Sequence, residues 1–122
     1  MSTLRRGTVA GLAAIAAAVA VAVSAWAATP QNVTVTAGKP SEFKFTLSKK
    51  TVKKGAPVVF KVTNRGAIAH DFKIAGKKTA QLAAGKTATL RVTFAKTGKF
   101  AYLCTLPTHA TAGMKGTITV VK

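Results

Sequence analysis

Apolar and polar residues alternate along several short stretches of the chain. In residues 42–47, for example, Phe43, Phe45 and Leu47 share one face and Glu42 lies on the other. Apolar side chains at every second position are typical of half-buried antiparallel strands. No stretch after residue 28 has convincing helical periodicity. The stretches with this alternation are residues 32–35, 42–47, 58–63, 90–95 and 117–120.

Glycine and proline separate these stretches at short intervals. About seven or eight short strands divided by such turn signals predict an antiparallel β-sandwich. We find no internal repeat and no sign of a second domain. The turn signals include Gly38-Lys39-Pro40, Gly55-Ala56-Pro57, Asn64-Arg65-Gly66, Gly85-Lys86 and Thr97-Gly98-Lys99.

Residues 1–27 have a different pattern. Two arginines precede a long uncharged run rich in alanine and valine, and Ala25-Trp26-Ala27 supplies the small residues of a signal-peptidase site. We predict a cleaved signal peptide, which would leave residues 28–122 as one exported domain in a periplasmic or other extracytoplasmic space. The alternative is an uncleaved membrane anchor, because the run is about as long as the ~20 residues of a spanning helix.

One segment near the C-terminus concentrates the residues that bind soft metals. It holds the single cysteine of the chain, Cys104, followed by His109 and Met114 at the spacing Cys-x4-His-x4-Met. The only other histidine is His70. A thiolate, two imidazoles and a weak axial thioether form the ligand set of blue-copper electron-transfer sites. An unpaired cysteine in an exported protein also calls for a metal bond or a reactive thiol.

Strand parity predicts how these donors meet. His70 shares a face with Phe72 and points inward, whereas Asp71 points outward. Cys104 shares the inward face of Tyr102. Two inward donors at the ends of two strands would meet at one pole of the sandwich. The loop after Cys104 would bring the other two donors to the same place.

The composition is less consistent with an enzyme than with an electron-transfer site. A catalytic zinc needs an open water position and a nearby general base. The chain has only two carboxylate side chains, Asp71 and Glu42, and we expect Glu42 to lie in a distant strand. A Cys104 nucleophile with a His109 base would leave Met114 and His70 without a role. We therefore expect a protein that is not an enzyme.

The sequence resembles the cupredoxins, the plastocyanin and azurin group of small blue-copper proteins. The resemblance rests on Ala69-His70-Asp71-Phe72 followed by Tyr102-x-Cys104-x4-His109-x4-Met114-Lys115-Gly116, and covers about residues 31–122. It implies a Greek-key β-sandwich with one type 1 copper ion that cycles between Cu(I) and Cu(II). It also implies that His70, Cys104 and His109 are equatorial ligands and that Met114 is a long axial ligand.

Two features depart from the best-known members of that family. The loop spacing matches neither plastocyanins, with Cys-x2-His-x4-Met, nor azurins, with Cys-x4-His-x3-Met. Asp71 stands where the family usually has an asparagine. In this position its carboxylate could accept a hydrogen bond from Thr105 and brace the ligand loops.

The resemblance implies outer-sphere electron transfer through the edge of His109. Apolar residues surround that histidine in the sequence and suit brief docking of a partner. A copper-delivery protein using the same ligands is the alternative. The apolar residues are Leu106, Pro107, Ala110 and Ala112, together with Ala67 and Ile68 from the other loop.

The charge of the chain indicates its partners. The net charge is +17, and loss of the two arginines of the signal peptide would reduce it to +15. We expect acidic redox partners of the cytochrome or copper-oxidase type, contact with an anionic membrane or cell envelope, and a monomer. Nucleic acid is disfavoured, because the exported part has no tryptophan and its phenylalanines mostly take inward positions.

Overall fold

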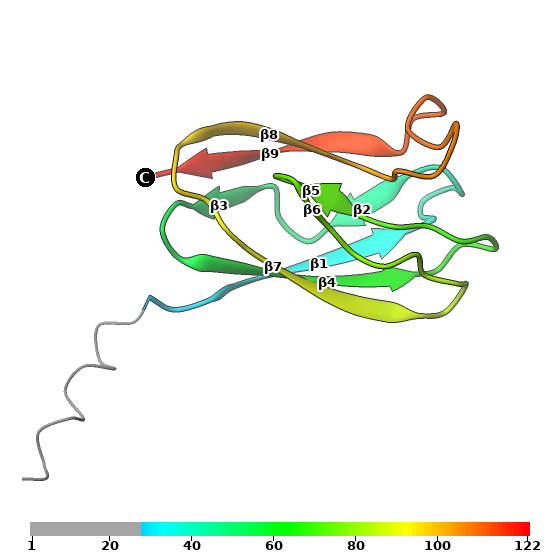
Figure 1. Cartoon of the computed structure of the whole chain (residues 1–122), viewed down its shortest axis with the longest axis horizontal. Helices are drawn as coiled ribbons and strands as arrows, with labels where there is room; N and C mark the ends of the chain where they lie inside the picture. The colour runs from blue at the N-terminus through cyan, green and yellow to red at the C-terminus, as the bar shows by residue number, and fades with distance from the viewer. Residues whose placement is uncertain (1–27) are drawn as a thin grey trace, which may run out of the picture.

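The strands form two sheets that pack against each other. The structure, a computed structural model, describes residues 28–122, and the predicted signal peptide lies outside them. The sheet orders are β2-β1-β4-β7 and β3-β9-β8-β5-β6 (Figure 1). The predicted β-sandwich is confirmed by these two sheets. Residues 28–122 contain no helix, and therefore none that could cross a bilayer. The strands are β1 (Gln31–Ala37), β2 (Phe45–Leu47), β3 (Thr51–Lys53), β4 (Pro57–Asn64), β5 (Lys73–Ile74), β6 (Lys77–Lys78), β7 (Thr87–Thr93), β8 (Gly98–Leu103) and β9 (Lys115–Val121).

The core between the sheets follows the predicted alternation. Val58, Phe60 and Val62 of β4 are fully buried, while Lys61 between them is exposed. The opposite sheet contributes Tyr102, among others, to the same apolar cluster. Burying an aliphatic or aromatic side chain of this kind stabilises the fold by about 1.5–3 kcal/mol.

Strand direction is only partly as predicted. Five of the seven pairings are antiparallel, but β1 pairs with β4 and β3 pairs with β9 in parallel. Both sheets are therefore mixed, and the expectation of purely antiparallel sheets needs this correction. Alternation along a strand reports which side chains are buried, and it carries no information on the direction of the neighbouring strand.

Two predicted strands are shorter than their alternation suggested. The stretch that carries His70 is paired as a strand only at β5, and His70 itself forms an isolated bridge with Leu82. Alternation from Glu42 onward becomes a strand only at Phe45, where β2 begins. In both places the residues before the strand belong to a connection. Regular alternation therefore does not determine where the side chains of Glu42 and His70 point.

Three connections lie at one end of the sandwich. Figure 1 shows the orange connection from β8 to β9, the green one after β4 and the connection from β1 to β2 at the end opposite the C-terminus. They contain residues 104–114, 65–72 and 38–44, respectively. All predicted metal donors belong to the first two of these segments.

We predict that Phe60→Ala lowers the free energy of unfolding by about 3–5 kcal/mol, because the ring is fully buried and contacts Phe72 with ring centroids 5.3 Å apart. Urea unfolding of the metal-free protein measures this loss. The matched control is Lys61→Ala on the exposed face of the same strand, which should change stability by at most about 0.5 kcal/mol. Equal losses in the two variants would contradict the assigned core.

Candidate metal centre

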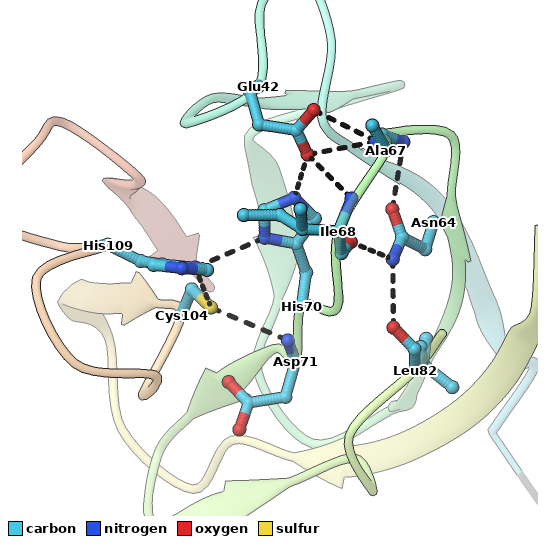
Figure 2. A network of polar contacts seen from close by, with 10 residues as sticks. Glu42, Asn64, Ala67, Ile68, His70, Asp71, Leu82, Cys104 and His109 are labelled. Atoms are coloured by element: carbon cyan, nitrogen blue, oxygen red, sulfur yellow. Dashed lines mark hydrogen bonds and ion pairs between the residues drawn. The ribbon is translucent and has the colours of Figure 1, made fainter. Parts of the chain in front are cut away.

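His70, Cys104 and His109 converge on one buried point. Their donor atoms all lie within 4.8 Å of one another. The two Nδ1 atoms are 3.2 Å apart, and Cys104 Sγ is 3.4 Å from His109 Nδ1 (Figure 2). Two Nδ1 atoms that face each other cannot both be protonated donors in this contact, so at least one offers a lone pair. The donor set therefore fits a metal ion.

Met114 lies at the same end of the sandwich. Its side chain is fully buried and belongs to one apolar cluster with Cys104 and Ala37. The Met114 carbonyl accepts a hydrogen bond from the Cys104 N–H at 3.1 Å, and the Met114 N–H donates to the His109 carbonyl at 3.0 Å. The two ends of the loop, Cys104 and Met114, are therefore hydrogen-bonded to each other. All four residues predicted to bind the metal lie close together.

Tight turns fill the loop between Cys104 and Met114. The Ala112 N–H donates to the Thr108 carbonyl at 3.0 Å, and the Gly113 N–H donates to the Ala110 carbonyl at 2.9 Å. Gly113 has a φ of 115°, a left-handed conformation that glycine adopts without a steric penalty. These turns accommodate the spacing of four residues on each side of the second histidine.

Two of the buried donors, Cys104 and His109, favour their uncharged forms when no cation is bound. Burial raises the pKa of the Cys104 thiol, and the Asp71 N–H, 3.5 Å from its sulfur, acts in the opposite direction. Burial also lowers the pKa of His109, and the neighbouring His70 ring adds to that effect. Metal binding as a thiolate therefore has to displace the thiol proton.

Asp71 joins the two donor-bearing segments. The Thr105 N–H donates to Asp71 Oδ1 at 2.6 Å, and the Thr105 hydroxyl donates to Oδ2. The predicted hydrogen bond with Thr105 is confirmed. The prediction that Asp71 points outward was wrong, since its side chain is 3% exposed. Regular parity does not apply here, because β5 begins only at Lys73 and the chain before it turns both His70 and Asp71 inward.

Glu42 lies at the site. The expectation that it lies in a distant strand was wrong. Its Oε2 atom is 2.6 Å from His70 Nε2. The carboxylate also accepts hydrogen bonds from the Ala67 N–H at 2.9 Å and the Ile68 N–H at 3.4 Å. The bond from Ala67, followed by that from His70, lowers the pKa of Glu42. The prediction failed because alternation placed Glu42 in β2, which starts three residues later.

Two further residues that support the site were not singled out from the sequence. Asn64 is fully buried, and its Nδ2 atom donates to the Ile68 and Leu82 carbonyls at 2.8 Å each. The Asn64 amide thereby holds the segment that leads to His70 (Figure 2). The Phe43 ring packs against His109 with centroids 5.0 Å apart. An asparagine in a turn and a phenylalanine in a strand have ordinary roles in a sequence, so no signal distinguished them.

The predicted apolar surroundings of His109 include exposed positions. Ile68 is 44% exposed, which is unusual for a large apolar side chain within residues 28–122, and Pro107 and Ala112 are exposed as well. His109 itself is 8% exposed. Apolar surface is thus available in both segments that carry the histidines.

Comparison with known proteins identifies the family. The family model described as "Cupredoxin-like domain" matches residues 9–120. The chain belongs to the cupredoxins. This match confirms the resemblance to the cupredoxins seen in the sequence. A separate search of curated proteins found no similar protein.

Several solved structures are similar in fold to this cupredoxin. Auracyanin B aligns with a TM-score of 0.68 and 22% identity, over 75% of this chain and 89% of that chain. Auracyanin A, titled a "blue" copper protein from Chloroflexus aurantiacus, has a TM-score of 0.65 and 18% identity, over 75% and 99%. Rusticyanin from Thiobacillus ferrooxidans has a TM-score of 0.65 and 22% identity, over 75% and 77%. At these identities the likeness supports the fold.

We predict that Asp71→Ala destabilises the metal-free protein by about 1–3 kcal/mol, because the N–H and hydroxyl of Thr105 lose their acceptors. Asp71→Asn should cost less, since its carbonyl oxygen can still accept one of the two bonds. Urea unfolding compares the variants. Wild-type stability in Asp71→Ala would show that this bridge does not hold the two segments together.

Proposed function

We propose that this cupredoxin is an exported electron-transfer protein in which His70, Cys104, His109 and Met114 hold one type 1 copper ion. The observation that carries the proposal is the convergence of three buried donors within 4.8 Å, with Met114 buried beside Cys104. The cofactor is copper. One thiolate, two imidazoles and a thioether suit this metal better than zinc, for which a thioether is a poor ligand.

The protein contributes a donor set that is held in place before any ion binds. When bound, copper supplies one-electron chemistry by cycling between Cu(I) and Cu(II). Asp71 ties the segment after Cys104 to the segment of His70, and Asn64 fixes the backbone that leads to His70. Donors restrained in this way need not rearrange between the two charge states, which favours fast electron transfer.

We assign no catalysed reaction to the site. Asp71 is engaged with Thr105, and Glu42 is engaged with His70 and two backbone amides. Neither carboxylate is therefore available as the general base that a hydrolytic metal site requires. The donors are also buried, which suits outer-sphere electron transfer through the protein.

Docking would use apolar contact close to the metal and charge attraction at longer range. The exposed apolar residues around His109 offer an uncharged contact surface through which an electron could pass. Nineteen Lys and Arg against two acidic side chains favour approach of an acidic redox protein, of the cytochrome or copper-oxidase type. The signal-like pattern of residues 1–27 supports an extracytoplasmic location.

A copper-delivery role would use the same four residues. Burial of the donors and the bracing by Asp71 favour retention of the ion, and so favour electron transfer. Reversible reduction and reoxidation of the loaded protein without loss of copper would agree with this choice. Transfer of copper to an acceptor protein would favour delivery.

We predict that adding Cu(II) to the purified protein produces an intense blue thiolate-to-copper absorption band, because Cys104 is the only cysteine. Cys104→Ser should lose the band completely. Thr111→Ser is a matched control, since Thr111 is exposed in the same loop, and should remain blue. A colourless or weakly coloured wild-type complex would rule out type 1 copper.

We also predict that the rate of electron exchange with an acidic cytochrome falls about tenfold or more as salt is raised, because the attraction of opposite charges is screened. Stopped-flow measurements over a range of ionic strength test this. An uncharged small reductant serves as the control and should show little dependence. A flat profile with the acidic cytochrome would exclude electrostatic steering.

A further inference from the structure

The acidic side chains of this chain have an uneven distribution. The sequence contains 19 Lys and Arg residues but only two acidic residues, Glu42 and Asp71. Both lie at the metal centre, where each contacts a donor or the residue next to one. All other charged side chains of the protein are cationic. Asp71 binds Thr105, the residue after Cys104, whereas Glu42 contacts the donor His70 directly.

Glu42 is bound from three directions. Its Oε2 atom accepts from His70 Nε2 at 2.6 Å, and the two oxygens lie 2.9 and 3.1 Å from the Ala67 N–H. The Ile68 N–H is a third donor at 3.4 Å. Figure 2 shows the carboxylate above the His70 ring, on the side away from Cys104 and His109. The ring thus contacts Glu42 through Nε2 and the other donors through Nδ1.

The backbone leaves room for this contact. A Cβ atom at Gly66 would collide with Glu42 Oε2 and would lie 3.0 Å from His70 Nε2. A Cβ atom at Gly38 would in turn collide with the backbone of Gly66. Two glycines without side chains therefore allow the segment of Glu42 to approach the segment of His70.

We propose that Glu42 is a positioning residue that sets both the orientation of His70 and the charge balance of the copper site. By accepting a hydrogen bond from Nε2–H, the carboxylate keeps the proton on Nε2 and the Nδ1 lone pair directed at the other donors, as carboxylates do behind metal-bound histidines in general. Its negative charge favours the oxidised ion, which carries one more positive charge than the reduced ion. This inference rests on the proposed copper site.

The charge effect is expected to be appreciable because the contact is short and His70 is fully buried. The 19 lysines and arginines of the chain favour the reduced state through their positive charge. The Glu42 carboxylate, which contacts a proposed copper ligand, acts in the opposite direction. Loss of an outer partner of a metal-bound histidine typically changes metal affinity by about 10–100-fold.

The experiment compares Glu42→Gln, Glu42→Ala and Thr97→Lys in the full protein. Glu42→Gln removes the charge but keeps an oxygen that can accept from His70. Thr97→Lys raises the net charge by the same amount at an exposed position. Thr97 precedes the first residue of β8, and Cys104 follows the last residue of that strand, so the added charge lies at the opposite end of β8 from the donor. Reduction potentials by voltammetry and affinities for Cu(II) and Cu(I) are measured for each variant.

We expect Glu42→Gln to weaken Cu(II) binding about tenfold more than Cu(I) binding. For a one-electron couple this raises the reduction potential by about 59 mV. Thr97→Lys should leave the potential close to that of the wild type. A potential in Glu42→Gln that matches Thr97→Lys would overturn the charge effect.

Proton NMR of the metal-free protein tests the positioning without copper. The wild type and Glu42→Gln should show a His70 Nε2–H resonance protected from exchange with water, and Glu42→Ala should lose it. Absence of this protected proton in the wild type would overturn the positioning role. A wild type that shows the proton but no blue band with Cu(II) would overturn the proposed function and leave the contact between Glu42 and His70 in place.

Discussion

The register of β5 against β8 is the constraint on which the site depends. Lys73 pairs with Leu103 and Ile74 with Tyr102. Continued by two residues beyond the strands, this register sets Asp71 opposite Thr105, which is where the carboxylate bridges the two segments. Cys104 and His70 are then neighbours although 34 positions separate them in the chain. A slip of one residue would separate the donors, because it would turn alternate side chains to the other face.

Burial gives the centre its chemical character. Apolar neighbours such as Phe43 and Ala37 enclose the Cys104 thiol and the His109 imidazole, and burial disfavours charge on either of these two groups alone. The only two carboxylate side chains of the protein, Glu42 and Asp71, bind His70 and Thr105 beside the donors, while the lysines lie on exposed positions. The negative side chains are therefore gathered at the site and the positive ones are spread over the surface.

Much of the fold and the donor set could be predicted from local patterns. Val58, Phe60 and Val62 alternate with polar or less buried positions, and that period is imposed by strand geometry itself. His70, Cys104, His109 and Met114 could be singled out because residues 28–122 contain so few side chains able to bind a soft metal. Parity failed at Asp71 and Glu42, since both precede a strand and their side chains are directed by hydrogen bonds across loops.

Local sequence patterns are enough to predict the β-sandwich class, the inward faces of the main strands and the four donor types with their spacing, because each depends on residues close together in the chain. Which strands run parallel and which residues brace the donors became known from the folded arrangement alone. Glu42 reaches His70 across 28 positions, through a gap left by Gly66. Such a contact depends on how separate loops approach one another in space, and no local pattern records that distance.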